Sequence, residues 1–217
     1  MKTTTATLLL LLAGAAQATV AGSKHDLSAT GTGIHSPTTP QVCLFCHTPH
    51  GGLSLWNRAP STTAPESIRL YASPSLSAAG SAARLDGKSR SMLCLSCHGE
   101  PLANIGGLVL NTLGNDMAVV DPRGTWTTSG VLWDRVAVNH PIGFDYAQAL
   151  AAKPTRLEPL SGTNVGLLPL FNATAQGSTV TTSMECSTCH TVHDATNSPF
   201  LRVDNASNGL CLACHIR

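Results

Sequence analysis

The chain has 217 residues, and its 13 Lys and Arg nearly balance its 12 Asp and Glu, which leaves a formal net charge of +1. This balance excludes a polybasic surface for nucleic acid and an acidic tail. Hydrophobic residues make up 42% of the chain, too many for a disordered chain of low net charge, yet aromatic residues contribute only 4%. The 19 Gly and 13 Pro favour turns and loops. Because large flat side chains are scarce, we expect another group to fill the core.

Residues 1–18 have the order of features of a secretory signal peptide. Lys2 is followed by an apolar run over 8–16, and Ala-Gln-Ala at 16–18 is typical of a cleavage site. A membrane span needs roughly 20 apolar residues, and this run is about half that length. We therefore expect a secreted mature chain that starts near Thr19, lies in the extracellular medium or the periplasm, and has no membrane span.

The eight cysteines form four pairs of identical spacing, and a histidine follows each pair at once. The four motifs are Cys43-x-x-Cys46-His47, Cys94-x-x-Cys97-His98, Cys186-x-x-Cys189-His190 and Cys211-x-x-Cys214-His215. C-x-x-C-H is the attachment motif for c-type haem. Four such motifs predict four covalently bound haem c groups.

The spacing has a chemical reason. The two thiols add to the two vinyl groups on one edge of a porphyrin, so their sulfurs must lie one short helical turn apart. The next residue then directs its imidazole to the iron as the proximal axial ligand. We therefore expect a mostly irregular chain with short α-helices at the motifs, a multihaem cytochrome c architecture in which porphyrins replace a conventional core.

Other uses of paired cysteines explain the pattern less well. Disulfides are common in secreted chains, but they do not require a histidine after every pair. Zinc sites do not require histidine at that one position. A thioredoxin-like redox motif occurs once, near a βαβ pattern, and not four times.

The four motifs alternate in kind, which indicates a duplicated two-haem module. Motifs one and three read C-x-x-C-H-T-x-H, whereas motifs two and four read L-C-L-x-C-H. We therefore divide the mature chain into a first di-haem module over 19–98, a Cys-free insert or linker over 99–185, and a second di-haem module over 186–217. Within the insert we expect a strand over 130–138, a helix over 146–153 and a loop over 157–176.

Five histidines lie outside the motifs, and ligation of both faces of four haem irons requires four of them. The five are His25, His35, His50, His140 and His193. His50 and His193 follow motifs one and three closely, and the motif histidine already occupies the near face of its own haem. We therefore expect each to bind a neighbouring haem, His50 the second and His193 the fourth. His140 and one N-terminal histidine are then left for the first and third haems.

Several segments together resemble a known group, the doubled C-x-x-C-H tetrahaem cytochromes. They are Lys24-His-Asp-Leu-Ser28, Leu55-Trp-Asn-Arg58, Asn139-His-Pro-Ile142 and the C-x-x-C-H motifs, and they extend over about 25–217. The group includes the filament-forming extracellular cytochromes, or cytochrome nanowires, of metal-reducing bacteria and some archaea. The resemblance implies bis-histidine haems stacked in a continuous chain and subunits that polymerise end to end. It also implies that His25, rather than His35, is a ligand, with a position suited to donation in trans to a neighbouring subunit.

These features predict electron transfer without substrate chemistry, and so no enzyme activity, because six-coordinate iron has no open position for a small molecule. The expected partners are redox proteins or an extracellular electron acceptor, together with further copies of the chain. Two alternatives remain open: a soluble periplasmic shuttle, and a reductase of nitrogen or sulfur oxyanions, which needs one five-coordinate haem. Met92 and Met117 are alternative iron ligands, though neither lies in a repeated context.

Overall fold

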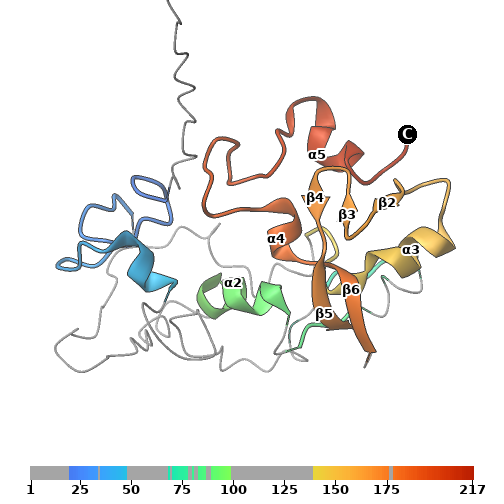
Figure 1. Cartoon of the computed structure of the whole chain (residues 1–217), viewed down its shortest axis with the longest axis horizontal. Coiled ribbons are helices and arrows are strands. Elements are labelled where there is room, and N and C mark those ends of the chain that lie inside the picture. Colours follow the sequence, from blue (N-terminus) through green and yellow to red (C-terminus); the bar gives the residue numbers. More distant parts are fainter. Residues whose placement is uncertain are drawn as a thin grey trace, which may run out of the picture.

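The computed structural model describes residues 20–33, 35–47, 68, 70–77, 80, 83–86, 89–98, 139–175 and 178–217, and most of this chain is irregular (Figure 1). Its helices are η1 (Val42–Phe45, a 3₁₀ helix), α2 (Arg90–His98), α3 (Tyr146–Ala152), α4 (Cys186–Cys189), η6 (Ala206–Asn208, also 3₁₀) and α5 (Gly209–Leu212). Each C-x-x-C-H motif begins on one of the helices η1, α2, α4 and α5. The prediction of an irregular chain with short helices at the motifs is confirmed. No helix in the described ranges is long and apolar enough to cross a membrane.

A three-stranded antiparallel sheet leads into the third motif. The strand β6 (Ser178–Met184) lies between β1 (Phe144–Asp145) and β5 (Phe171–Ala175). The β6 sequence STVTTSM is rich in Thr and Val, whose branched side chains favour strands. Because β6 ends directly before Glu185 and α4, the sheet fixes the start of the third motif.

The loop expected over 157–176 is wrong, because this segment forms strands. A second sheet contains β2 (Leu160–Ser161), β3 (Asn164–Val165) and β4 (Leu168–Pro169), and β5 follows at once. The turn-forming residues that favoured a loop make the two tight turns of this sheet, where Gly162 has φ +63° and Gly166 has φ +54°. Strands of two residues leave no alternating pattern that a sequence can show.

The helix expected over 146–153 is confirmed as α3, and it packs into the main core. Asp145 caps its start by accepting a hydrogen bond from the Ala147 N–H (3.0 Å). Tyr146 is 1% exposed and packs with Val165, Leu168 and Cys214 of the fourth motif. The expected strand over 130–138 and the signal peptide over 1–18 lie outside the described residues.

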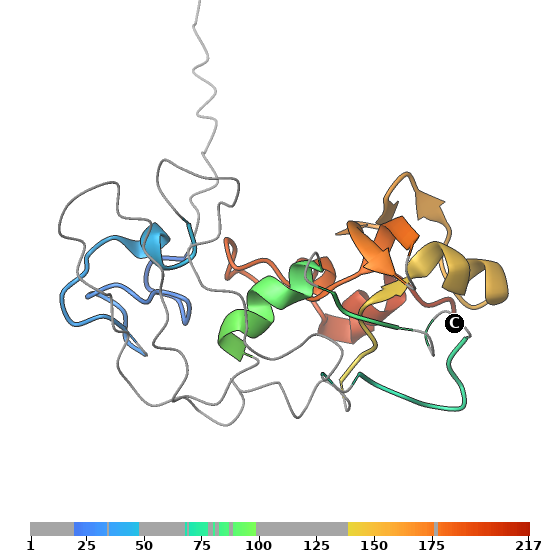
Figure 2. The ribbon, with the colours of Figure 1, turned by 90° about the horizontal axis from the view of Figure 1, so that it is seen from below.

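Helix α2 lies between the N-terminal segment 20–47 and the C-terminal half of the chain, and it contacts α4 (Figures 1 and 2). The N-terminal segment has a small cluster of its own, in which buried Phe45 packs against Leu27 and Cys46. The second motif therefore lies beside the third, although 92 residues separate Cys94 from Cys186 in the sequence.

Candidate functional site

All eight motif cysteines are described, and none of them forms a disulfide. Each pair lies on or at the end of its short helix, which holds the two sulfurs one turn apart. Gln41 makes no side-chain capping hydrogen bond at the start of η1, whereas Glu185 forms a capping box at the start of α4. The placement of all four pairs at short helices is consistent with the attachment of haem c.

The motif histidines are placed by their own backbone surroundings. The Nδ1 atom of His190 lies 3.0 Å from the carbonyl oxygen of Pro199. His140, outside the motifs, makes the same kind of contact with the carbonyl of Pro141 at 2.9 Å. A ring whose Nδ1–H donates to a carbonyl keeps the lone pair of Nε2 for a metal. This contact therefore prepares both rings for ligation.

Three motif histidines each lie beside one of the additional histidines. The distance between ring centroids is 5.9 Å for His98 and His25, 5.9 Å for His47 and His193, and 6.3 Å for His215 and His140. Two imidazoles that share a metal ion from opposite sides have centroids about 6 Å apart, because each nitrogen lies roughly 2 Å from the metal and each ring centre roughly 1 Å farther. The spacing of all three pairs therefore fits the two axial ligands of one haem iron.

The electrostatics of two of these rings also fit ligation. Burial, together with the neighbouring His98 and His190, lowers the pKa of His25 to about 4. Burial is also the main cause that lowers the pKa of His140; His215 adds to this, and the contact with the Pro141 carbonyl acts against it. Both rings are neutral at pH 7, as a metal ligand must be. The Nδ1 atom of His25 is buried, and it has no hydrogen-bond partner among the described residues.

These histidine pairs differ from the pairs that we expected from the order of the motifs along the chain. His193 lies beside His47 of the first motif, whereas the fourth motif has His140 beside it. The second motif, expected to pair with His50, lies beside His25 of the same chain. Helix α2 belongs to the first module and α4 to the second. Because the two helices pack together, histidines of one module lie near motifs of the other.

The remaining candidate ligands are two histidines and two methionines. His35 makes a similar contact, from its Nδ1 to the carbonyl oxygen of Gly33 at 2.6 Å, but within the described residues no motif histidine lies beside its ring. Met92 packs against the buried pair Leu85 and Leu95, which is an ordinary core position. His50 and Met117 lie outside the described residues.

The thiols of the second, third and fourth motifs lie close to one another. A hydrogen bond between Cys94 and Cys186, together with burial, raises the pKa of the Cys94 thiol, and the same bond lowers that of Cys186. Burial raises the pKa of Cys189 to about 11 and that of Cys214 to about 12. Neighbouring thiols add to the shift in both cases, with Cys211 near each of them.

The C-terminal part of the chain matches a known protein family. A family described as Doubled CXXCH motif matches residues 179–217, the segment that contains the third and fourth motifs. No curated protein matches the chain. The doubled motif is consistent with a multihaem c-type cytochrome that transfers electrons, and the C-x-x-C-H motifs imply covalently bound haem c.

Two further residues near the motifs, Glu185 and Tyr146, lie outside the C-x-x-C-H pattern, so the pattern does not point to them. Glu185 directly precedes the third motif and has no exposed surface. The sequence does not indicate its role, because Glu185 and Thr188 form a capping box in the reverse of the usual residue order. Tyr146 joins α3 to the fourth motif. The sequence around this tyrosine does not indicate that contact.

Proposed function

We propose that the protein is a tetrahaem c-type cytochrome whose function is electron transfer. The observation that carries this proposal is the placement of a second histidine about 6 Å from the motif histidines of three of the four motifs. The cysteines of each motif would hold the porphyrin edge, and the paired imidazoles would hold both axial positions. When bound, haem iron supplies a one-electron couple. With both axial positions held by histidine, an iron would have no open place for a substrate, which favours a carrier over an enzyme.

His50 is the distal ligand that we assign to the third haem. Motifs one and three have the same extended pattern, and His193, which follows motif three, lies beside His47 of motif one. His50 occupies the same position after motif one, so we assign it to His190 of motif three. The complete distal set is then His25, His50, His140 and His193. A histidine donated in trans by another subunit is the other candidate for the iron of His190.

We further propose that the mature protein is extracellular and polymerises. The signal-like sequence over 1–18 supports secretion, and the resemblance to filament-forming cytochromes supports a polymer of this chain. Redox proteins or an external electron acceptor would be its partners. Electron microscopy of the secreted material tests the polymer: filaments are expected, and uniform monomers under native conditions would favour a periplasmic shuttle.

The central test is the intact mass of the full-length protein matured with haem, combined with a pyridine haemochrome spectrum and electron paramagnetic resonance. We expect four covalently bound haems and low-spin ferric signals. Fewer haems, or cysteines joined to one another, would contradict the proposal. A large high-spin signal in the wild type would favour the reductase instead.

The variants His50→Ala and His193→Ala test the ligand assignment. Each should keep four haems, because the cysteines hold them, and each should convert one haem to high spin. His193→Ala should affect the haem attached to Cys43 and Cys46, and His50→Ala the haem attached to Cys186 and Cys189. A low-spin third haem in purified monomers of His50→Ala would contradict the assignment of His50.

A further inference from the structure

A single carboxylate joins the helices of the second and third motifs. Glu185 lies directly before α4, and its Oε2 atom accepts hydrogen bonds from the backbone N–H of Ser91 (3.0 Å) and from the Ser91 hydroxyl, both in the first turn of α2. The Ser91 hydroxyl in turn accepts a hydrogen bond from the backbone N–H of Cys186 (3.0 Å). Glu185 and Ser91 thus connect α2 and α4 in both directions.

The same side chain also caps its own helix. Glu185 forms a capping box with Thr188: its carboxylate accepts from the Thr188 N–H, and the Glu185 N–H donates to the Thr188 hydroxyl (3.0 Å). Its second oxygen, Oε1, accepts from the hydroxyl of Ser183 at 2.7 Å. The free N–H groups at the starts of two helices therefore converge on one carboxylate.

Such a carboxylate is a costly feature for stability alone. Glu185, Ser91, Ser183 and Thr188 are each 0% exposed, and among the described residues the hydrogen-bond partners of the carboxylate are uncharged. Moving an ionised group out of water carries a large desolvation penalty, which apolar residues of similar volume would avoid. What the carboxylate adds is direction, because its bonds to Ser91 fix the angle and separation of α2 and α4.

The joined helices carry the attachment points of two haems. Cys94 lies one turn after Ser91 on α2, Cys186 is the first residue of α4, and the two thiols are close enough to share a hydrogen bond. A shift of α2 against α4 would therefore move one haem anchor against the other.

We propose that Glu185, acting through Ser91, is a positioning residue that sets the separation and orientation of the second and third haems; this inference rests on the proposed function. Electron transfer and excitonic coupling between neighbouring porphyrins both depend steeply on that separation. Glu185 touches neither haem iron in this role, and it acts through the two helices.

The test compares Glu185→Gln and Ser91→Ala with the control Ser183→Ala in the matured full-length protein. Gln keeps the shape of Glu but places an amide N–H₂ group among donors, Ser91→Ala removes the hydroxyl that bridges the helices, and Ser183→Ala removes a bond that does not reach α2. Haem content is measured by mass, and haem coupling by the bisignate Soret signal in circular dichroism.

We expect Glu185→Gln and Ser91→Ala to keep four low-spin haems but to lose amplitude in the Soret couplet, whereas Ser183→Ala keeps the amplitude even where its thermal stability falls. The double variant should lose no more than the stronger single variant, because the two residues act as one unit. An unchanged couplet in both test variants, with wild-type haem content, would overturn the proposal.

Incomplete maturation of the variants also gives an answer, because haem-bearing peptides can be mapped one by one. Selective loss of the second and third haems supports the positioning role, whereas equal loss of all four would show a general folding role and overturn it. A wild-type protein with fewer than four haems would instead refute the proposed function. The two failures are therefore distinguishable.

Discussion

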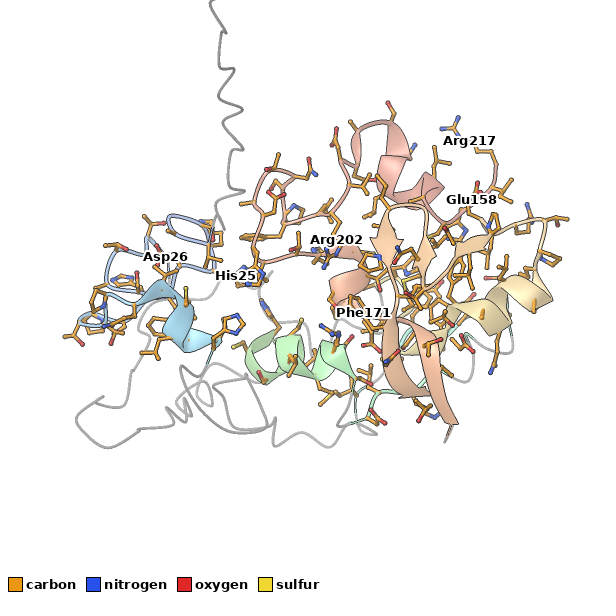
Figure 3. All side chains as sticks on the ribbon, viewed as in Figure 1. His25, Asp26, Glu158, Phe171, Arg202 and Arg217 are labelled. Atoms are coloured by element: carbon orange, nitrogen blue, oxygen red, sulfur yellow. The ribbon has the colours of Figure 1, made fainter. Side chains whose placement is uncertain are left out.

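His25 owes its position to the residues on either side of it. The buried carboxylate of Asp26 accepts hydrogen bonds from the Gly22 N–H (2.8 Å), the Ser28 N–H (3.1 Å) and the Ser28 hydroxyl (2.6 Å), which close the loop around the histidine. The ring of Phe200 packs on the imidazole at a centroid distance of 4.6 Å. Figure 3 shows His25 at the side of the N-terminal segment that faces the C-terminal half of the chain. The loop thus presents one ring to the second motif.

Replacement of His25 by Ala should convert one haem to high spin. The cysteines still attach all four haems, so the intact mass should fall only by the substitution, while the second haem loses its distal ligand. His35→Ala is the matched control, because among the described residues no motif histidine lies beside that ring. Electron paramagnetic resonance distinguishes the two: a low-spin spectrum for His25→Ala, or a high-spin signal for His35→Ala, would contradict the assignment of His25.

The carboxylate of Asp26 makes this loop sensitive to acid. Burial raises its pKa, but the hydrogen bonds from Gly22, Ser28 and Thr30 lower it by more, so that the net pKa lies below the ordinary value. A lowered carboxyl pKa stabilises the fold above the pKa of the unfolded chain, and this contribution is lost as the pH falls through the lower pKa of the folded state.

Asp26→Asn should therefore destabilise the protein at neutral pH and less so in acid. We expect a loss of about 1–3 kcal/mol in the free energy of unfolding at pH 7, because an amide leaves one donor without an acceptor. The difference from wild type should shrink as the pH falls below about 4. Urea unfolding at pH 7 and in acid measures both, with the exposed Asp194→Asn as control. A difference that grows in acid would contradict this explanation.

At the scale of elements, short helices depend on contacts outside themselves. Helix α4 has four residues, far fewer than an isolated helix needs in water. Helix α3 has seven, and Tyr146 at its first position donates a hydrogen bond to the carbonyl of Glu158 (2.9 Å), with the carbonyl of Cys214 at 3.3 Å. Tyr146 thereby holds α3 and the fourth motif together.

Removal of the Tyr146 hydroxyl tests this contact. Tyr146→Phe keeps the buried ring and should lower the free energy of unfolding by about 1–2 kcal/mol, because the two carbonyls lose a donor in a buried site. Tyr71→Phe is the control, since its ring is half-buried and no hydrogen bond to its hydroxyl is found within the described residues. Thermal or urea unfolding of the two holoproteins gives the comparison. Equal losses would show that the Tyr146 hydroxyl contributes nothing specific.

The sequence predicts those parts of the molecule that follow from local chemistry. The helices at the motifs follow from the spacing of two thiols, and α3 follows from a run of Ala and Leu after the capping residue Asp145. The strands β2, β3 and β4 could not be predicted, because strands of two residues are too short to show a period of two. The neighbours of His25 and His193 could not be predicted either, because they depend on the packing of α2 against α4.

At the scale of the whole molecule, the third motif is the meeting point of the other three. Cys186 contacts Cys94 of the second motif, and Cys189 has the thiols of the fourth motif among its neighbours. His193, three residues after His190, lies beside His47 of the first motif. The motifs are therefore not arranged in space in their sequence order, with each module separate from the other.

This arrangement makes loss of the third haem more disruptive than loss of the fourth. Cys186→Ser with Cys189→Ser should yield a protein with three haems in which the fourth no longer exchanges electrons rapidly with the first and second. Cys211→Ser with Cys214→Ser also leaves three haems, but exchange among the remaining three should continue, because the third motif still contacts the other two. Flash photoreduction with time-resolved Soret absorbance measures the exchange in both proteins. Equal slowing in the two variants would contradict the central place of the third haem, since exchange would then follow some route that does not pass through the third motif.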